Sequence, residues 1–183
     1  MPLPESPPRT EIHLRRIEMR GYRRDDGLYE IDGRVTDTKS HPLLLEERGE
    51  IPPGEPVHDM WVRLVVDEDL LVHDVVAVSD ATPYRVCREA VDAMRAIVGE
   101  RIKAGWSAMV KERLGGRAGC THLMELLMPL GTAAYQTLSA LRIARPDVLD
   151  RSGRPVKIDS CYAFASEREV VARRWPAFHR PPT

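Results

Sequence analysis

Apolar and polar residues alternate so regularly in residues 58–66 that this stretch predicts a β-strand. Every second position from Met60 to Val66 is apolar, and Asp59, Trp61 and Arg63 alternate with this set. A period of two places one set of side chains on each face of a sheet. The acidic run 67–69 then turns the chain into a second strand, residues 70–78, which completes an antiparallel meander. Two earlier runs, residues 12–20 and 28–35, flank a turn-like Arg-Asp-Asp-Gly and predict a hairpin.

The period changes to that of helices after the meander. Thr82-Pro83 is typical of a helix start, and apolar residues then recur at helical spacing as far as Gly99. A second helix begins near Trp106 and stops at Gly115-Gly116, and a third runs from about residue 120 to 144. Strands followed by helices predict an α+β fold, in which an N-terminal antiparallel β meander precedes three helices.

Proline marks the segments that we expect to lie outside these elements. Residues 1–10 hold four prolines, and we expect a disordered arm over residues 1–11. Residues 42–56 hold four more with two glycines, and they predict a loop or lid. We therefore expect one α+β domain at residues 12–145, with a C-terminal extension at 146–183 that packs on it.

Charge and hydropathy exclude several classes of partner. The formal net charge is -1, so no overall field attracts nucleic acid or an anionic membrane. No apolar run approaches the ~20 residues that a membrane span needs, and the first residues lack a signal peptide's apolar core. We expect a cytoplasmic protein with no nucleic-acid or membrane partner, and self-association stays open. Three cysteines in such a compartment are free thiols or metal ligands.

The strongest candidate site is Gly119-Cys120-Thr121-His122, which opens the third helix. Free backbone N–H groups at a helix start favour a thiolate, so Cys120 is a candidate nucleophile or metal ligand. His122 and Glu125 are three positions apart and share a helical face, so Glu125 can serve as a metal ligand or orient the His122 imidazole. The alternative is a buried cysteine with a histidine near a helix cap.

Three further residues are candidate ligands. Cys87 lies in the first turn of the first helix, although a lone cysteine there is often a small core residue. His58 and Asp59 begin the central strand directly after the proline-rich segment. Successive strand residues face opposite ways, so at most one of these two points into a shared site.

Basic residues near the N-terminus could bind an anion. Arg24 belongs to an arginine-rich stretch, and Lys39 follows it closely. Guanidinium and ammonium groups suit carboxylates and phosphates, while solvated surface charge is the alternative. Phosphate-loop, dinucleotide-binding and nucleophile-elbow motifs are absent from the sequence.

The chain resembles a bacterial family of unknown function, DUF2889, across most of residues 12–141. The resemblance implies membership of a family that has no established activity. The stretches that carry it are His13-Leu14-Arg15-Arg16-Ile17, residues 21–28, Thr36-Asp37-Thr38-Lys39, Val57-His58-Asp59-Met60, and Gly119-Cys120-Thr121-His122-Leu123 with Glu125.

A more distant similarity is to iron-sulfur cluster scaffold proteins, which have a three-stranded antiparallel sheet followed by helices. In those proteins a Gly-Asp dipeptide starts a strand, a cysteine opens the next helix, and His-Cys opens the last long helix. The resemblance implies a site built from Asp59 or His58 with Cys87, Cys120 and His122. His58 stands near the position of the first of the three cluster cysteines.

Together these features predict a mononuclear site with two thiolates, one imidazole, and a carboxylate or second histidine. This ligand mixture suits a transition metal, zinc or iron. We expect a metal-dependent lyase or hydrolase that acts on a small anionic organic substrate, with Glu125, Lys39 and Arg24 as catalytic residues. The alternative is a carrier or scaffold for iron or an iron-sulfur cluster, and a third class is an interaction module with a structural metal.

Overall fold

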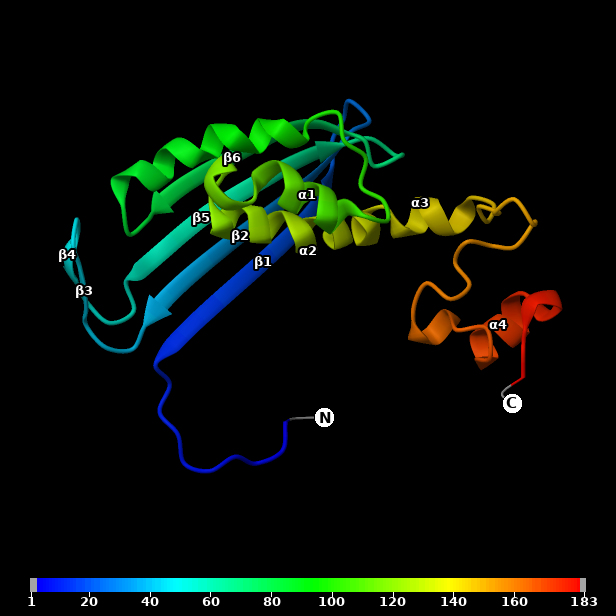
Figure 1. The fold of residues 1–183 in the computed structure, drawn as a ribbon, viewed down its shortest axis with the longest axis horizontal. Helices are drawn as coiled ribbons and strands as arrows, with labels where there is room; N and C mark the ends of the chain where they lie inside the picture. The colour runs from blue at the N-terminus through cyan, green and yellow to red at the C-terminus, as the bar shows by residue number, and fades with distance from the viewer. Residues whose placement is uncertain (1–2, 182–183) are drawn as a thin grey trace. The chain divides into compact units, whose positions relative to one another are not determined.

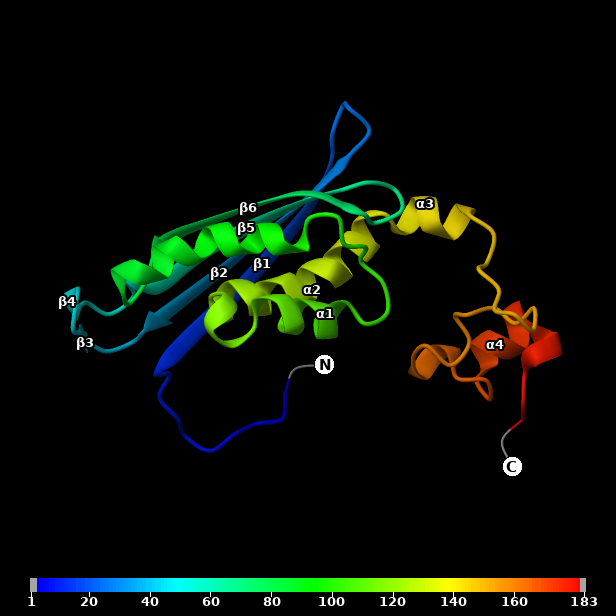
Figure 2. The same ribbon diagram turned by 45° about the horizontal axis from the view of Figure 1, so that its top comes forward.

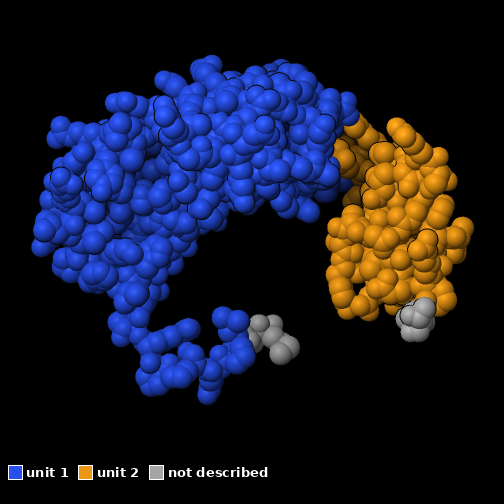
Figure 3. Space-filling view, viewed as in Figure 1, with its two compact units in different colours: residues 1–139 blue, residues 140–183 orange. Residues whose placement is uncertain are grey.

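The computed structural model describes residues 3–181 and divides the chain into two compact units, residues 1–139 and 140–183 (Figure 3). Residues 3–11 of the expected N-terminal arm contain no helix or strand. The outermost positions of the expected arm and extension, 1–2 and 182–183, lie outside the described residues.

An antiparallel sheet of four long strands forms the first unit's framework (Figure 1). Its strands follow one another across the sheet in the order β1-β2-β5-β6, and each pairs antiparallel with its neighbour. The expected α+β class, with an antiparallel sheet that precedes the helices, is therefore confirmed. The strands are longer than the sequence pattern predicted: β1 spans His13–Arg23, β2 Tyr29–Lys39, β5 Pro56–Val66 and β6 Val72–Ala81.

The predicted loop at residues 42–56 is not wholly irregular. Short strands β3, Leu43–Leu45, and β4, Gly49–Ile51, pair with each other between β2 and β5. Proline prevents ladder pairing only where it occurs, and Pro42 and Pro52 lie just outside the two strands. The segment between them keeps its backbone N–H groups and forms a small hairpin.

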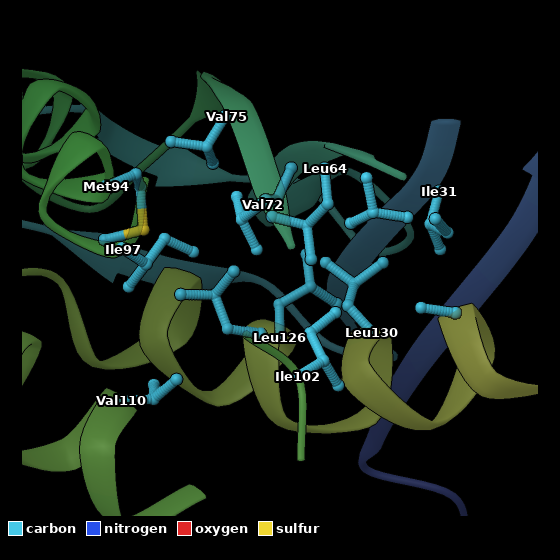
Figure 4. Packing of buried hydrophobic residues seen from close by; sticks show 14 of the residues in the cluster. Ile31, Leu64, Val72, Val75, Met94, Ile97, Ile102, Val110, Leu126 and Leu130 are labelled. Carbon is cyan, nitrogen blue, oxygen red and sulfur yellow. The ribbon is translucent and has the colours of Figure 1, made fainter. Parts of the chain in front are cut away.

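Two helices lie against one face of the sheet, α1, Trp106–Leu114, and α2, Thr121–Thr137 (Figure 2). Leu126 and Leu130 of α2 pack in the same cluster as strand residues Ile31 and Leu64 (Figure 4). Burial of apolar side chains between these two layers is the main stabilising contribution to the fold. The described residues of the cluster that are fully buried include Ile31, Met60, Leu64, Leu70, Met94, Ile97, Leu114, Leu123, Leu126, Leu127, Leu130 and Leu138.

Two helices differ from their predictions. The segment expected as the first helix is a 3-10 helix, η1, at Arg85–Ile97, and the Thr82 hydroxyl donates to the Tyr84 carbonyl instead of capping a helix. The long helix expected to reach residue 144 is interrupted at Leu138, where the backbone leaves helical geometry, and continues as α3, Ser139–Ala144. A single 3-10 turn, η2, at Gly116–Ala118, precedes α2.

The second unit is small and mostly irregular. Asp147 connects two of its later segments, because its carboxylate accepts hydrogen bonds from the Lys157 amine at 2.9 Å and the Trp175 indole at 2.8 Å. Residues 156–159 lie in turns. Among the described residues, no helix is both long and apolar enough to cross a membrane. The remaining helical segments are η3, Tyr162–Phe164, α4, Glu169–Arg174, and η4, Pro176–Phe178.

Candidate metal centre

Three polar residues form a row across the helix-covered face of the sheet. Arg15 of β1 is paired in register with Asp37 of β2, and Asp37 is paired with His58 of β5. Asp37 and His58 each lie two positions from a core residue of the same face, Val35 and Met60, and Arg15 is directly opposite Asp37 in the ladder. The strand period of two therefore points all three side chains towards the helices.

The first turn of α2 supplies the fourth group. Cys120 is the N-cap residue with an extended backbone, and His122 follows inside the helix. The imidazole of His122 stacks on that of His58, with ring centroids 3.9 Å apart and planes tilted by 32°. Two histidines far apart in the sequence thus meet between the sheet and α2.

Asp37, His58 and His122 each offer a ligand atom, and these atoms lie within 4.8 Å of one another. They come from three separate elements, β2, β5 and α2. Asp37 is buried, and the two histidines are partly buried. In the part of the chain that the structure describes, this group has the composition and spacing of a metal-binding cluster.

Asp37 is bound tightly by its neighbours on β1. Arg15 donates from Nε to one carboxylate oxygen and from Nη2 to the other, each at 2.8 Å, and His13 Nε2 lies 2.9 Å from Oδ1. Burial alone would raise the pKa of Asp37, but the hydrogen bonds from Arg15 and His13 hold it well below its usual range. The carboxylate is therefore ionised throughout the physiological range.

His58 is held as a neutral imidazole. Burial and the nearby His122 lower the pKa of His58 to about 4, and the attraction of Asp37 only partly opposes them. Its Nδ1 lies 3.1 Å from Asp37 Oδ2, but Nδ1 is buried without a well-aligned hydrogen bond. A neutral imidazole keeps one lone pair, which is the form that binds metals.

Cys120 and His122 interact directly. Burial raises the pKa of the Cys120 thiol, but hydrogen bonds from the His122 imidazole and from the backbone N–H groups of Leu123 and His122 lower it overall. The same hydrogen bond raises the pKa of His122, although burial opposes it. The two pKa shifts are in the direction of a thiolate beside an imidazolium. A deprotonated thiol and a neutral imidazole are the forms that bind a metal.

The structure brings some of the predicted ligands together and keeps others apart. His58 and His122 meet at the cluster, and Cys120 is hydrogen-bonded to His122 without being one of the converging groups. Asp59 is on the opposite sheet face. There Arg34 donates to both Asp59 oxygens, at 2.8 and 2.6 Å. Cys87 is partly buried on η1 and is not among the converging ligand groups.

The predicted catalytic residues are also divided. Glu125 lies one turn after His122, with its Oε2 atom 3.7 Å from Arg15 Nη1 and its side chain 52% exposed. Lys39 follows Asp37 by two positions at the end of β2, on the same face. Arg24 lies at the β1–β2 turn, the opposite end of these strands, where it pairs with the carboxylates of Asp26 and Glu30. The structure therefore does not place Arg24 at the cluster.

Asp37, Arg15 and His13 were not predicted as site residues. The signal was present in part, because a hairpin centred on Asp26 pairs position 15 with position 37. The pairing of Asp37 with His58 had no such local signal, since a long connection separates β2 from β5.

Residues 13–136 match the family described as protein of unknown function (DUF2889), which is about two thirds of the chain. The chain belongs to the DUF2889 family. The cluster and the residues around it, from His13 to Glu125, all lie in the matched part of this DUF2889 protein. No curated protein and no solved structure gave a significant match. The similarity of this DUF2889 chain to iron-sulfur cluster scaffolds stays a prediction.

Proposed function

We propose that the cluster binds one transition metal ion, zinc or iron, and that the protein is a metal-dependent enzyme. The supporting observation is the convergence of ligand atoms from Asp37, His58 and His122 within 4.8 Å, on three elements that the core holds in place. Cys120, hydrogen-bonded to His122, adds a thiolate at the same helix start. Side chains fixed by packing suit a preorganised site.

The ligand types favour zinc or iron. Imidazole and thiolate are the usual ligands of Zn²⁺ and are common for iron, whereas calcium and magnesium prefer oxygen atoms. His58 and His122 of the converging group provide two imidazoles, and Cys120, hydrogen-bonded to His122, provides a thiol as the third group. A site with three protein ligands leaves a coordination position open, where a metal can activate water or polarise a carbonyl.

Groups around the cluster support a substrate of small size and negative charge. Glu125 is half exposed beside the cluster and can act as a general base or acid for a bound molecule. Lys39 places an ammonium group on the same sheet face, where it can attract a carboxylate or phosphate. Arg24 has no part in this proposal because it lies at the other end of the strands.

An iron or iron-sulfur carrier is the second candidate, favoured by the stabilised Cys120 thiolate at the start of α2. The two functions differ in what the purified protein contains. A cluster carrier holds acid-labile sulfide and absorbs visible light, whereas a mononuclear enzyme holds one sulfide-free metal ion.

Elemental analysis of the untagged chain, produced with added zinc or iron, tests the proposal. We expect about one ion per chain, and His58→Ala, His122→Ala and Cys120→Ser should each lose most of it. Cys161→Ser is the matched control, because Cys161 is exposed in the second unit. Metal far below one ion per chain, or equal loss in the Cys161 variant, would refute the proposal.

Cys87→Ser tests the earlier ligand prediction separately. Cys87 is absent from the converging group, so a variant that retains its metal would identify this cysteine as a packing residue. Metal loss in this variant with retained thermal stability would restore Cys87 to the ligand set.

A further inference from the structure

The carboxylate of Asp37 is already occupied on both oxygens. The guanidinium of Arg15 donates one hydrogen bond of 2.8 Å to each carboxylate oxygen, and His13 Nε2 lies 2.9 Å from Oδ1. A metal ion bound directly to Asp37 would lie beside this positive charge or would have to displace it. Asp37 is therefore better suited to accept a hydrogen bond from a neighbouring side chain than to bind a metal cation.

That neighbour is His58. Its Nδ1 atom is 3.1 Å from Asp37 Oδ2, while its side chain is only 14% exposed. Nδ1 is one of two buried side-chain polar atoms without a well-aligned partner among the described residues. A proton on Nδ1 that faces the carboxylate leaves the lone pair on Nε2, the other ring nitrogen.

We propose that Arg15 and Asp37 form a positioning pair that fixes the tautomer and orientation of His58, and that neither residue binds the metal. This inference rests on the proposed metal site and assigns its ligands as His58 Nε2, His122 and Cys120. Carboxylates that accept from the distal N–H of a histidine ligand raise its basicity and hold its ring. The row Arg15, Asp37 and His58, in register across three strands, has the order that this role requires.

Arginine is suited to the outer position of this row. Its planar fork fixes both oxygens of the carboxylate, whereas lysine would hold the charge without fixing the plane. Arg15 retains a third nitrogen, Nη1, which lies 3.7 Å from Glu125 Oε2 and connects the pair to α2. A substitution at Arg15 should consequently change the tautomer and orientation of the His58 ring, although the two residues lie on strands that are not adjacent.

Arg15→Met separates the positioning role from direct ligation by the sign of its effect on metal affinity. If Asp37 orients His58, loss of the fork lowers affinity for Zn²⁺ or Co²⁺ by about 10–100-fold in chelator competition. If Asp37 is itself a ligand, removal of the competing guanidinium raises affinity instead. Arg15→Lys should fall between the parent and Arg15→Met, and Arg16→Met is the control because Arg16 is an exposed neighbour on the same strand.

A second measurement does not depend on metal. Nitrogen-15 NMR of the metal-free full chain reports which imidazole nitrogen of His58 carries the proton. The parent and Arg16→Met should show the Nδ1-protonated tautomer, and Arg15→Met and Asp37→Ala should show a mixture. An unchanged tautomer, or unchanged or raised metal affinity in Arg15→Met, would overturn the inference.

The two measurements also distinguish this inference from the proposed function. A parent chain that binds no metal refutes the proposed function. In that case the NMR measurement on the metal-free chain still shows whether Arg15 and Asp37 fix the tautomer of His58. A thermal melt of each variant identifies those that fail to fold. If Arg15→Met is unfolded, the smaller change in Arg15→Lys supplies the comparison, and an Arg15→Lys chain identical to the parent in both measurements overturns the inference.

Discussion

His58 and His73 lie on neighbouring strands, yet their surroundings are opposite. His58 faces the helices and is partly buried beside Asp37 and His122. At His73 the β5–β6 register shifts between Val65 and Val66, and the shift leaves this residue outside the ladder. Its imidazole is 42% exposed and its Nε2 atom is 2.9 Å from Asp67. Residue type alone therefore did not distinguish the candidate ligand His58 from the surface histidine His73.

This difference predicts different effects of the same substitution. His73→Ala should leave metal affinity unchanged, because its side chain contacts Asp67 and solvent at the β5–β6 turn. His58→Ala should lower affinity by at least about 10-fold, as expected for loss of a ligand or its close support. Chelator competition on both variants makes the comparison, and equal affinities would remove His58 from the site.

Asp67 gives a prediction for pH. Burial opposes its charge, but hydrogen bonds from His73 and from the backbone N–H groups of Leu71 and Asp69 lower its pKa overall. A lowered folded-state pKa contributes stability above the unfolded value near 4, and this contribution is lost as pH falls through the folded pKa. Asp67→Asn should therefore cost up to about 1 kcal/mol at pH 7 and less at pH 3.

Urea unfolding at the two pH values measures this difference. Asp25→Asn is a matched control, because Asp25 is an exposed aspartate in the β1–β2 turn. A loss of stability for Asp67→Asn that is as large at pH 3 as at pH 7 would contradict the titration argument and leave only a structural effect.

At the scale of elements, close packing of α1 against α2 depends on Gly131. A Cβ atom at this position would lie 2.8 Å from two atoms of the Trp106 ring and 3.3 Å from Ile102. The ring cannot move freely, because its Nε1 donates a buried hydrogen bond of 2.9 Å to the Leu127 carbonyl. The small residue therefore sets how closely the two helices approach.

Gly131→Ala should destabilise the protein although alanine favours helix. The gain in helix propensity is about 1 kcal/mol, and overpacking a fixed contact costs about 1–3 kcal/mol. We expect a net loss in the free energy of unfolding, measured with urea, while exposed Gln136→Ala in the same helix changes it little. A Gly131→Ala protein as stable as the parent would show that Trp106 can shift.

At the scale of the whole molecule, the first unit contains a complete core and the entire candidate site. The core extends from Tyr29 to Leu138, and Leu138 is fully buried. Asp37, His58 and His122 belong to this unit, and so do the residues around them, from His13 to Glu125. The family match, residues 13–136, covers nearly the same stretch.

A chain that ends at Ser139 should therefore fold cooperatively and bind metal as the full chain does. A chain that ends at Leu130 lacks Ala134 and Leu138, and loss of such buried side chains costs several kcal/mol. Circular dichroism melts and metal analysis of both chains test this. Failure of the longer one to melt cooperatively would show that residues 140–183 are required for folding.

The sequence by itself determined the α+β class, the family and one part of the site. Strand alternation and helical spacing are local patterns, so they predicted the meander and the placement of α1 and α2. Cys120 and His122 are two residues apart at a helix start, and their interaction follows from local geometry. The sequence pattern failed where backbone geometry overrode it, as at η1 and at the break near Leu138.

Only the tertiary structure decided which distant residues join this pair. The β2–β5 register, with its bulge after Asp37, is set by the burial of both strands under α2 and not by any turn between them. That register brings Asp37 to His58, turns Asp59 to the opposite face, and leaves Cys87 outside the cluster. The candidate site thus depends on pairings between segments far apart in the chain, because packing of the core selects one register among those that local patterns allow.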